Sequence, residues 1–217
     1  MNDSKNSQIK SKERVAERGE VFTNEREVKA MCDLVKDETE RIDSRFLEPA
    51  CGNGNFLAEI LTRKLAVVEK TYGKNLADYE KYSLVAVSSI YGVDIMADNA
   101  EECRERMLSI WESAYKKVFK SSPTFNECKT AAAFILSRNI LCGDALTLLD
   151  DKGEPIVFSE WSLVGNNVKR RDFTLANLLQ TQSYYELPLF EDVEDVAIPR
   201  PVREFAPIHF RKVYQDE

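Results

Sequence analysis

The chain has 217 residues, 43% of them hydrophobic and 31% charged, which predicts one globular domain with a hydrophobic core. No apolar run approaches the ~20 residues of a membrane span, and residues 1–12 lack the apolar centre of a signal peptide, so we expect a soluble cytoplasmic protein with no membrane contact. The net charge of −7 argues against a chain that holds DNA unaided, because such proteins carry a basic excess or a basic face.

The N-terminal region begins with a polar stretch of mixed charge, residues 1–18, which we expect to be a flexible arm or a frayed helix. A helix should begin after Thr23 or Asn24, since either side chain is a suitable N-cap and Glu27 follows Asn24 by three residues. The next apolar positions have helical spacing and define one buried face. They are Val28, Met31, Cys32 and Val35.

The following stretch predicts a strand, a tight turn and a helix. Residues 46–47 are typical of the end of a buried strand, which the acid and proline after them terminate. Gly52 and Gly54 permit positive φ and a close approach of a ligand to the backbone. Apolar residues with helical spacing then predict a helix over about 56–72. Backbone N–H groups at such a helix N-terminus can face a bound ligand, but the third glycine of a dinucleotide-binding fingerprint is missing.

A second strand is predicted over residues 90–95, after a helix over 76–89. It ends in Asp94, and a carboxylate in this position can accept both ribose hydroxyls of an adenosyl group. Asp94 lies 40 residues after Gly54 (94 − 54), beyond the usual ~20, so the helix between them would be an insertion. The alternative is that Asp94 is the N-cap of the next helix.

A third strand and turn, over residues 139–146, contain Asp144 and follow a helix predicted over 126–136. Residues 156–162 then have the pattern of a fourth strand. The alternation of strands and helices predicts a mostly parallel α/β sheet with its ligand at the carboxyl ends of the strands.

The five cysteines are odd in number and widely spaced, and the chain has one histidine, His209. This pattern argues against a disulfide framework and against a metal site, so we expect free thiols. We expect His209 to be structural or exposed rather than a catalytic base. The cysteines are Cys32, Cys51, Cys103, Cys128 and Cys142.

The nine residues from Glu48 to Phe56, Glu-Pro-Ala-Cys-Gly-Asn-Gly-Asn-Phe, resemble the cofactor-binding motif of adenine-N6 DNA methyltransferases, the modification enzymes of restriction systems. The resemblance implies a Rossmann-like methyltransferase fold with S-adenosylmethionine as the cofactor. In that family the acidic residue meets the methionine end of the cofactor, and the glycines let the cofactor approach the backbone.

Three further segments resemble motifs of the same family in the same order, over about residues 19–147. Gly19–Thr23 resembles the N-terminal motif that walls in the methionine part, with an ordinary capped helix as the alternative. The resemblance gives Asp94 the ribose and Ile95 the adenine face. It gives Asp144 the exocyclic amine of the adenine, with a solvated turn as the alternative. The implied cofactor-binding residues are Phe22, Thr23, Glu48, Pro49, Ala50, Gly52, Gly54, Asn55, Phe56, Asp94, Ile95 and Asp144.

The catalytic motif of that family, Asn-Pro-Pro-Tyr after the fourth strand, has no counterpart, because the chain contains no Pro-Pro. In that motif an amide oxygen and a backbone carbonyl localise the lone pair of the adenine amine, while the aromatic ring stacks on the flipped base. Trp161, Asn166 and Asn167 stand in this part of the chain. Without the prolines we interpret them as a core tryptophan and an Asn-rich turn, and the catalytic residues stay unknown.

The C-terminal part of the chain is predicted to form an irregular tail outside the cofactor-binding domain. Residues 168–173 form the densest basic stretch, either a solvated strand face or a contact for phosphates, and residues 175–179 suggest a brief helix. Residues 183–217 predict a proline-rich irregular tail whose apolar residues would suit docking to a partner. The cofactor-binding domain would then cover 19–182, truncated before the later strands and the target-recognition domain of a complete enzyme.

Three functions are consistent with this pattern. The first is the cofactor-binding part of a DNA adenine methyltransferase, contacting DNA through a partner subunit in a homo- or hetero-oligomer. The second is a catalytically silent, cofactor-binding regulatory or assembly subunit, which the missing Asn-Pro-Pro-aromatic motif favours. The third and weakest is a small-molecule methyltransferase.

Overall fold

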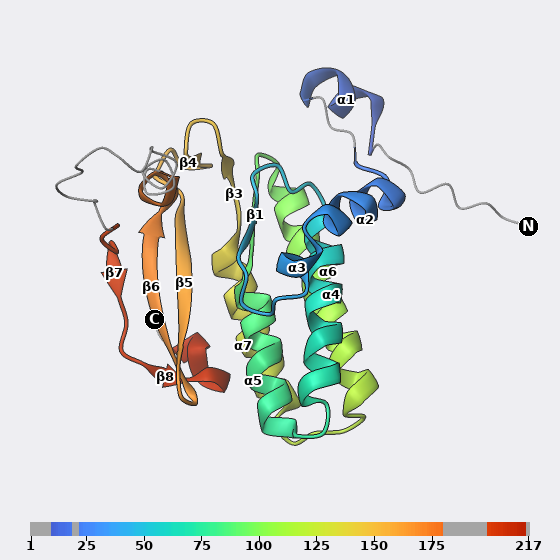
Figure 1. Ribbon diagram of the computed structural model, residues 1–217. Helices are drawn as coiled ribbons and strands as arrows, with labels where there is room; N and C mark the ends of the chain where they lie inside the picture. The colour runs from blue at the N-terminus through green and yellow to red at the C-terminus, as the bar shows by residue number, and fades with distance from the viewer. Residues whose placement is uncertain (1–9, 19–21, 180–198, 216–217) are drawn as a thin grey trace, which may run out of the picture.

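Helices, a mostly parallel sheet and an antiparallel sheet make up the computed structural model, which describes residues 10–18, 22–179 and 199–215 (Figure 1). The helices are α1 (Lys12–Arg18), α2 (Glu25–Leu34), α3 (Lys36–Thr39), α4 (Asn55–Tyr72), α5 (Leu76–Ser88), α6 (Ala97–Val118), α7 (Phe125–Asn139) and the 3₁₀ helix η1 (Phe210–Gln215). The strands are β1 (Phe46–Glu48), β2 (Ile90–Asp94), β3 (Ile140–Asp144), β4 (Leu149–Asp150), β5 (Val157–Val164), β6 (Asn167–Thr174), β7 (Arg203–Glu204) and β8 (Ile208–His209). Residues 19–21 and 180–198, which carry parts of the predicted N-terminal motif and of the predicted tail, lie outside the described residues.

The first sheet has the strand order β1-β2-β3-β4. Strand β2 pairs in parallel with β1 and with β3, with Leu47 opposite Tyr91 and Val93 opposite Leu141, while β4 is antiparallel to β3. Each parallel pair is joined through helices, as parallel pairing requires. The predicted α/β class with a mostly parallel sheet is therefore confirmed.

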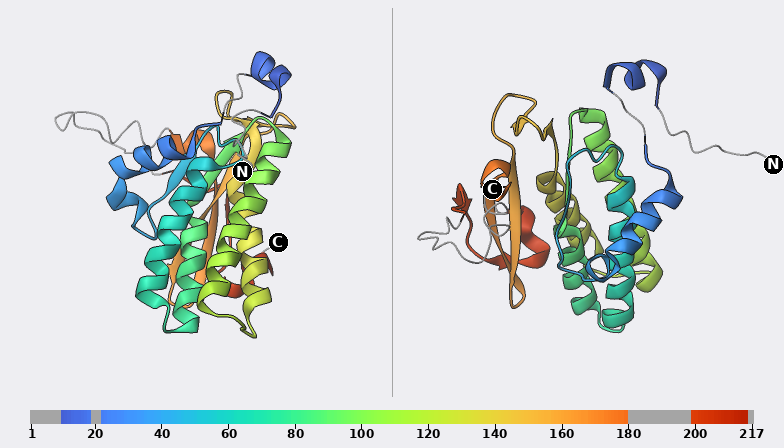
Figure 2. Two further views of the ribbon diagram at one scale, coloured as in Figure 1. Left: turned by 90° about the vertical axis from the view of Figure 1, so that its right-hand side faces the viewer. Right: turned by 45° about the horizontal axis from the view of Figure 1, so that its top comes forward.

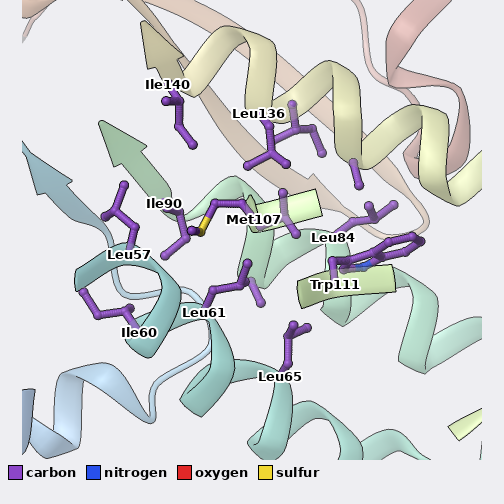
Figure 3. Close-up of a cluster of buried hydrophobic side chains, with 14 of the residues drawn as sticks. Leu57, Ile60, Leu61, Leu65, Leu84, Ile90, Met107, Trp111, Leu136 and Ile140 are labelled. Carbon is purple, nitrogen blue, oxygen red and sulfur yellow. The ribbon is translucent and has the colours of Figure 1, made fainter. Parts of the chain in front are cut away.

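Helices α4 to α7 run side by side along this sheet, α4 against α5 and α6, and α7 against the same two helices (Figure 2). Their apolar faces meet the sheet in one large core, which Figure 3 shows around the fully buried Trp111 and Met107 of α6. Alternate side chains of β2 face opposite layers, as the pleat of a strand dictates. Ile90 points into the helical core, while Tyr91 and Val93 pack in a second cluster with Ile156, Phe158 and Leu175.

The second sheet corrects the prediction for residues 156–162. Strand β5 does not continue the parallel sheet but pairs antiparallel with β6 along its full length. The link from β3 to β5 contains only the short strand β4, which is too little for a parallel crossover. A two-residue turn then connects β5 to β6, and Gly165, with φ +65°, supplies the positive φ that such a turn needs. The β5–β6 hairpin forms a separate layer in which β5 contacts α7 and α5, while Phe158 packs against Tyr91 of β2.

The prediction of an irregular tail is wrong for residues 199–215. Strands β7 and β8 both pair with β6, and Phe210 and Val213 of η1 belong to the main core. The prolines around these strands exclude helices but tolerate short edge strands, which explains why the composition was misleading. His209 lies in β8 and stacks on the ring of Phe210 at 4.5 Å between centroids, a structural position.

Two buried ionisable side chains, Lys64 and Glu80, connect segments of the fold that lie far apart in the sequence. The ammonium of Lys64 on α4 donates to Arg41 O, Ile42 O, Ser44 O and Ser89 Oγ, and burial lowers its pKa to about 7. The carboxylate of Glu80 on α5 is completely buried and accepts hydrogen bonds from four side chains. They are Tyr115, Ser122, Thr124 and Arg211. Lys64 thus holds the loop before β1, and Glu80 anchors the C-terminal η1.

Candidate functional site

A cleft opens at the carboxyl ends of β1, β2 and β3, where ligands bind in open parallel α/β sheets. Its cavity measures about 570 Å³, within the ordinary range for a small-molecule site. All the predicted cofactor-binding residues except Gly54 line it. They are Phe22, Thr23, Glu48, Pro49, Ala50, Gly52, Asn55, Phe56, Asp94, Ile95 and Asp144.

The two glycines of the turn have different reasons to be glycine. Both have positive φ, +52° at Gly52 and +83° at Gly54, which other residues adopt only with strain. A Cβ on Gly52 would lie 3.0 Å from the ring of Phe22, so Gly52 lets this aromatic wall close over the turn. A Cβ on Gly54 would lie 2.5 Å from Cys103 Sγ on α6. Gly54 therefore permits the packing of α4 against α6, and it does not line the cleft.

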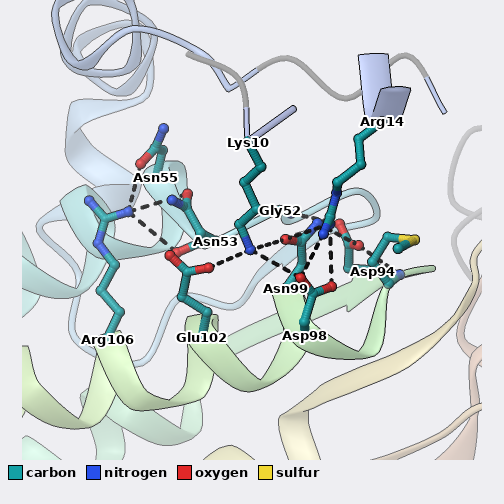
Figure 4. Close-up of polar contacts among 11 residues, drawn as sticks. Lys10, Arg14, Gly52, Asn53, Asn55, Asp94, Asp98, Asn99, Glu102 and Arg106 are labelled. Carbon is teal, nitrogen blue, oxygen red and sulfur yellow. Dashed lines mark hydrogen bonds and ion pairs between the residues drawn. The ribbon is translucent and has the colours of Figure 1, made fainter. Parts of the chain in front are cut away.

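Asp94 is the polar centre of the cleft (Figure 4). Its Oδ2 accepts the backbone N–H of Gly52 at 2.8 Å, while Oδ1 accepts the N–H of Met96 at 2.9 Å and Asn99 Nδ2 at 3.1 Å. Helix α6 begins at Ala97 with Met96 as its N-cap, so the alternative that Asp94 is the N-cap is wrong. These three neutral donors hold the carboxylate at the end of β2 and connect it to the glycine turn.

Two further carboxylates stand at the ends of the neighbouring strands. Glu48 ends β1, and burial raises the pKa of its carboxyl while a backbone hydrogen bond from Ala50 partly opposes this. Asp144 ends β3, and its Oδ1 accepts the backbone N–H of Leu146 at 2.8 Å, the turn contact that its alternative interpretation expected. With Asp94 these acids give the cleft an acidic lining, which suits a ligand that carries positive charge.

Helix α4 holds the described part of the N-terminal motif, Phe22 and Thr23, in place. Of the two predicted candidates, Thr23 and Asn24, the N-cap of α2 is Asn24, and its side chain accepts the N–H of Arg26. Asn55 Nδ2 donates to the carbonyl of Thr23 at 2.9 Å, and Asn55 Oδ1 accepts from Arg106 at 2.6 Å. Helix α4 thus fixes the backbone beside Phe22 at the mouth of the cleft.

Sequence reasoning missed the contribution of α6. Asn99 lines the cleft, and Arg106 supports Asn55 from outside it. Asn99, Cys103 and Arg106 are spaced by four and three residues along the helix, so they lie on one face of α6. This helical spacing after Asp94 was the signal that could have identified them.

The hairpin does not contribute to the cleft. The indole N–H of Trp161 donates to Asn139 Oδ1 at 3.0 Å and its ring packs edge-on against Phe134, so Trp161 has a packing role at the margin of the main core, where it is partly buried. The β5–β6 turn with Asn166 lies at the end of the molecule opposite the carboxyl ends of the parallel strands (Figure 1).

The cations of the basic stretch on β6 all have carboxylate partners. Arg170 is buried and pairs with Asp172, while Lys169 and Arg171 pair with acids on neighbouring strands. Of the two predicted alternatives, these pairings favour a solvated strand face, here with one buried ion pair, over a phosphate-binding surface.

In the part of the chain that the structure describes, no three His, Cys, Asp or Glu side chains lie close enough together to hold a metal ion. No helix among the described residues has the length and hydropathy to span a membrane. The five cysteines are free thiols, as predicted.

A family model, described as the DNA-methyltransferase domain of MmeI, matches residues 22–155. The matched region begins at Phe22, contains the whole parallel sheet and the cleft, and ends just before β5. Comparison with curated proteins and with solved structures finds no match.

Proposed function

The chain belongs to the family of the MmeI DNA-methyltransferase domain, and we propose that it binds S-adenosylmethionine in the cleft as the cofactor-binding part of a DNA adenine methyltransferase of a restriction-modification system. When bound, this cofactor supplies a methyl group on a positively charged sulfur. The observation that carries the proposal is the assembly, around one cavity, of residues that come from four separate segments of the chain. The acidic lining of that cavity complements the sulfonium and ammonium charges of the cofactor.

Each wall of the cleft has a proposed part in binding. Asp94 accepts hydrogen bonds from the ribose hydroxyls, and Ile95, 51% exposed at the rim, packs against the adenine. Asp144 accepts a hydrogen bond from the exocyclic amine of that adenine. Glu48 meets the methionine ammonium, and Phe22–Thr23 cover the methionine chain. Gly52 lets the cofactor approach the backbone of the turn.

Methyl transfer to adenine needs groups that this chain lacks in recognisable form. The exocyclic amine becomes nucleophilic only when acceptors localise its lone pair, and the sequence has no Asn-Pro-Pro-aromatic motif to provide them. The net charge of −7 also argues against DNA binding by this chain alone, because binding to the phosphate backbone depends on basic residues. We therefore propose that a partner subunit supplies DNA recognition and completes the catalytic site.

A second candidate function is a catalytically silent subunit that binds the cofactor for regulation or assembly. It is favoured by the β5–β6 hairpin, which occupies the part of the chain where the family's catalytic motif is expected. The two candidates share the cofactor cleft and differ only in whether transfer follows binding.

Calorimetric titration of the purified chain with S-adenosylmethionine, followed by a tritium-transfer assay on unmethylated DNA, tests both. Saturable binding with one cofactor per chain is expected. Transfer to DNA, alone or with a co-purifying partner, would establish the enzyme, whereas binding without transfer in either setting would favour the silent subunit. An absence of binding at millimolar cofactor would refute both.

A further inference from the structure

A continuous chain of hydrogen bonds links the N-terminal segment to the cleft (Figure 4). Lys10 Nζ donates to Asn99 Oδ1 at 2.8 Å, and Arg14 Nη2 donates to the same oxygen at 3.2 Å. On the other side of the amide, Asn99 Nδ2 donates to Asp94 Oδ1. The carboxylate of Asp94 then accepts the N–H of Gly52 through its second oxygen. Lys10 and Arg14 of the N-terminal segment are therefore connected through Asn99 and Asp94 to Gly52 of the glycine turn.

The orientation of the Asn99 amide follows from its neighbours. Two cationic donors approach its oxygen and a carboxylate accepts from its nitrogen, so the flipped amide would place oxygen against carboxylate and N–H₂ against cations. The residue is 1% exposed, so water has little access to replace either contact. Asn99 thus has one favourable arrangement as long as the cations are present.

Ion pairs hold these cations on the first two turns of α6. Arg14 contacts Asp98 at 2.6 Å, and Lys10 contacts Asp98 at 3.4 Å and Glu102 at 2.5 Å. The hydrogen bond from Arg14, with help from Lys10, lowers the pKa of Asp98 to about 2, so this acid stays ionised to a lower pH than an ordinary aspartate does. Asp98 also lies in the first turn of α6, where the helix dipole favours negative charge.

We propose that Asn99 is a positioning residue for the carboxylate of Asp94, and that Lys10 and Arg14 fix its amide, so that docking of the N-terminal segment on α6 raises the affinity of the cleft for the cofactor. This inference rests on the proposed function, because it assigns Asp94 to the ribose. A carboxylate held by fixed donors needs less ordering when a ligand binds, which increases affinity. Without the cations the Asn99 amide can turn its oxygen toward Asp94 and repel it.

Reciprocity gives the proposal a second consequence. If the docked segment raises the affinity for cofactor by some factor, the cofactor must stabilise the docked segment by the same factor. Hydrogen exchange of the backbone amides in α1 should therefore slow when S-adenosylmethionine is added.

The test compares full-length variants by calorimetric titration with S-adenosylmethionine. The double variant Lys10→Met/Arg14→Met should bind about fivefold more weakly than the unaltered chain, at the lower end of ordinary coupling between sites. The matched control, Lys116→Met/Lys117→Met, removes two cations in the last turn of α6 that form ion pairs with Glu112 and with Glu69 of α4, and it should leave the affinity unchanged. Asn99→Ala should weaken binding at least as much as the loss of both cations.

A double-mutant cycle separates positioning from general loss of structure. In an Asp94→Ala background the Lys10→Met/Arg14→Met change should cost no further affinity, because the group that it positions is gone. An equal loss in both backgrounds would overturn the proposal, and so would unchanged exchange in α1 on addition of cofactor. If the unaltered chain fails to bind, the proposed function falls and this inference with it. If it binds no more tightly than the double variant, only the inference falls.

Discussion

Glu48 is partly buried and Glu80 is completely buried, and the pKa values of the two carboxyls shift in opposite directions. Around Glu80, burial disfavours ionisation, but hydrogen bonds from Thr124, Tyr115 and Arg211 outweigh it and lower the pKa of the carboxyl. Around Glu48, burial dominates and raises the pKa, with only a backbone hydrogen bond opposing it. The helical interior compensates its buried charge with a cation, whereas the described residues of the cleft give Glu48 none.

This difference separates a structural carboxylate from one that is available to a ligand. A buried charge that already has its counterion gains little from a second one, while a desolvated carboxylate without a cation interacts strongly with any cation that arrives. Asp94 belongs with Glu48 in this respect, because its partners are neutral N–H groups of Gly52, Met96 and Asn99. The predictions below test whether the two regions respond differently to substitution.

The largest expected effect is on stability, from Arg211→Met. Its guanidinium makes two contacts to Glu80, whose carboxylate is completely buried, so the change leaves a buried charge without a cation. We expect the free energy of unfolding in urea to fall by about 3–5 kcal/mol. The affinity for S-adenosylmethionine, measured where the variant is folded, should stay the same. In the double variant Glu80→Gln/Arg211→Met part of the loss should return, and a single-variant loss below about 1 kcal/mol would place this pair with ordinary surface ion pairs.

The next effect separates the two roles of the glycine turn. Gly54→Ala should lower the free energy of unfolding by about 2–4 kcal/mol, because the new Cβ meets Cys103 Sγ in addition to the strain of a positive φ. Gly153→Ala is the matched control, since Gly153 has φ +81° and no atom lies within 4 Å of the position that the added methyl group would take. It should cost only the backbone term of about 1–2 kcal/mol. If the two variants lose the same free energy of unfolding, measured with heat or urea, α6 must move enough to accommodate the methyl group at position 54.

In the cleft the expected effect is on affinity. Asp94→Ala should weaken the binding of S-adenosylmethionine by about tenfold or more, which corresponds to about 1.4 kcal/mol for each factor of ten. Asp37→Ala, which removes an exposed acid on α3, is the control for the change in net charge. Calorimetry at fixed ionic strength measures both variants. Unchanged affinity in Asp94→Ala would show that the ribose assignment is wrong.

The smallest effect concerns pH. The pKa of Glu48 is raised above its ordinary value, so on acidification Glu48 takes up a proton before an unperturbed glutamate would. A cationic ligand prefers the ionised form, so its affinity should be constant at neutral pH and fall severalfold as pH decreases through the raised pKa. Glu48→Gln should bind more weakly at neutral pH and lose this pH dependence. A variant that keeps the full pH dependence would assign it to another group.

The sequence predicted the cleft better than the rest of the molecule, and the reason is physical. The glycine turn, Asp94 and Asp144 are local features at strand ends, and in a parallel sheet those ends meet at one edge whatever the details of packing. Helices α4 to α7 were predictable because their apolar positions repeat with a regular period.

The C-terminal layer was not predictable in the same way, because its stability comes from distant partners. Phe210 and Val213 have no periodic neighbours, and they are buried only because α5 and α7 offer a surface on which η1 packs. The role of Gly54 was misjudged for a similar reason, since its constraint comes from a residue 49 positions away in sequence, Cys103 (103 − 54). Spacing within a motif carries no information about such a neighbour.

The anchoring of η1 decides where the chain can be shortened for expression. The family match ends at residue 155, but a fragment cut there would lose Arg211 and expose the apolar surface of α5 and α7 on which η1 packs. Glu80 would then remain in the interior as an orphan charge. We therefore expect the folding unit to extend past the matched region to η1, and we expect a fragment that ends at residue 155 to be less stable and more prone to aggregation than the full chain.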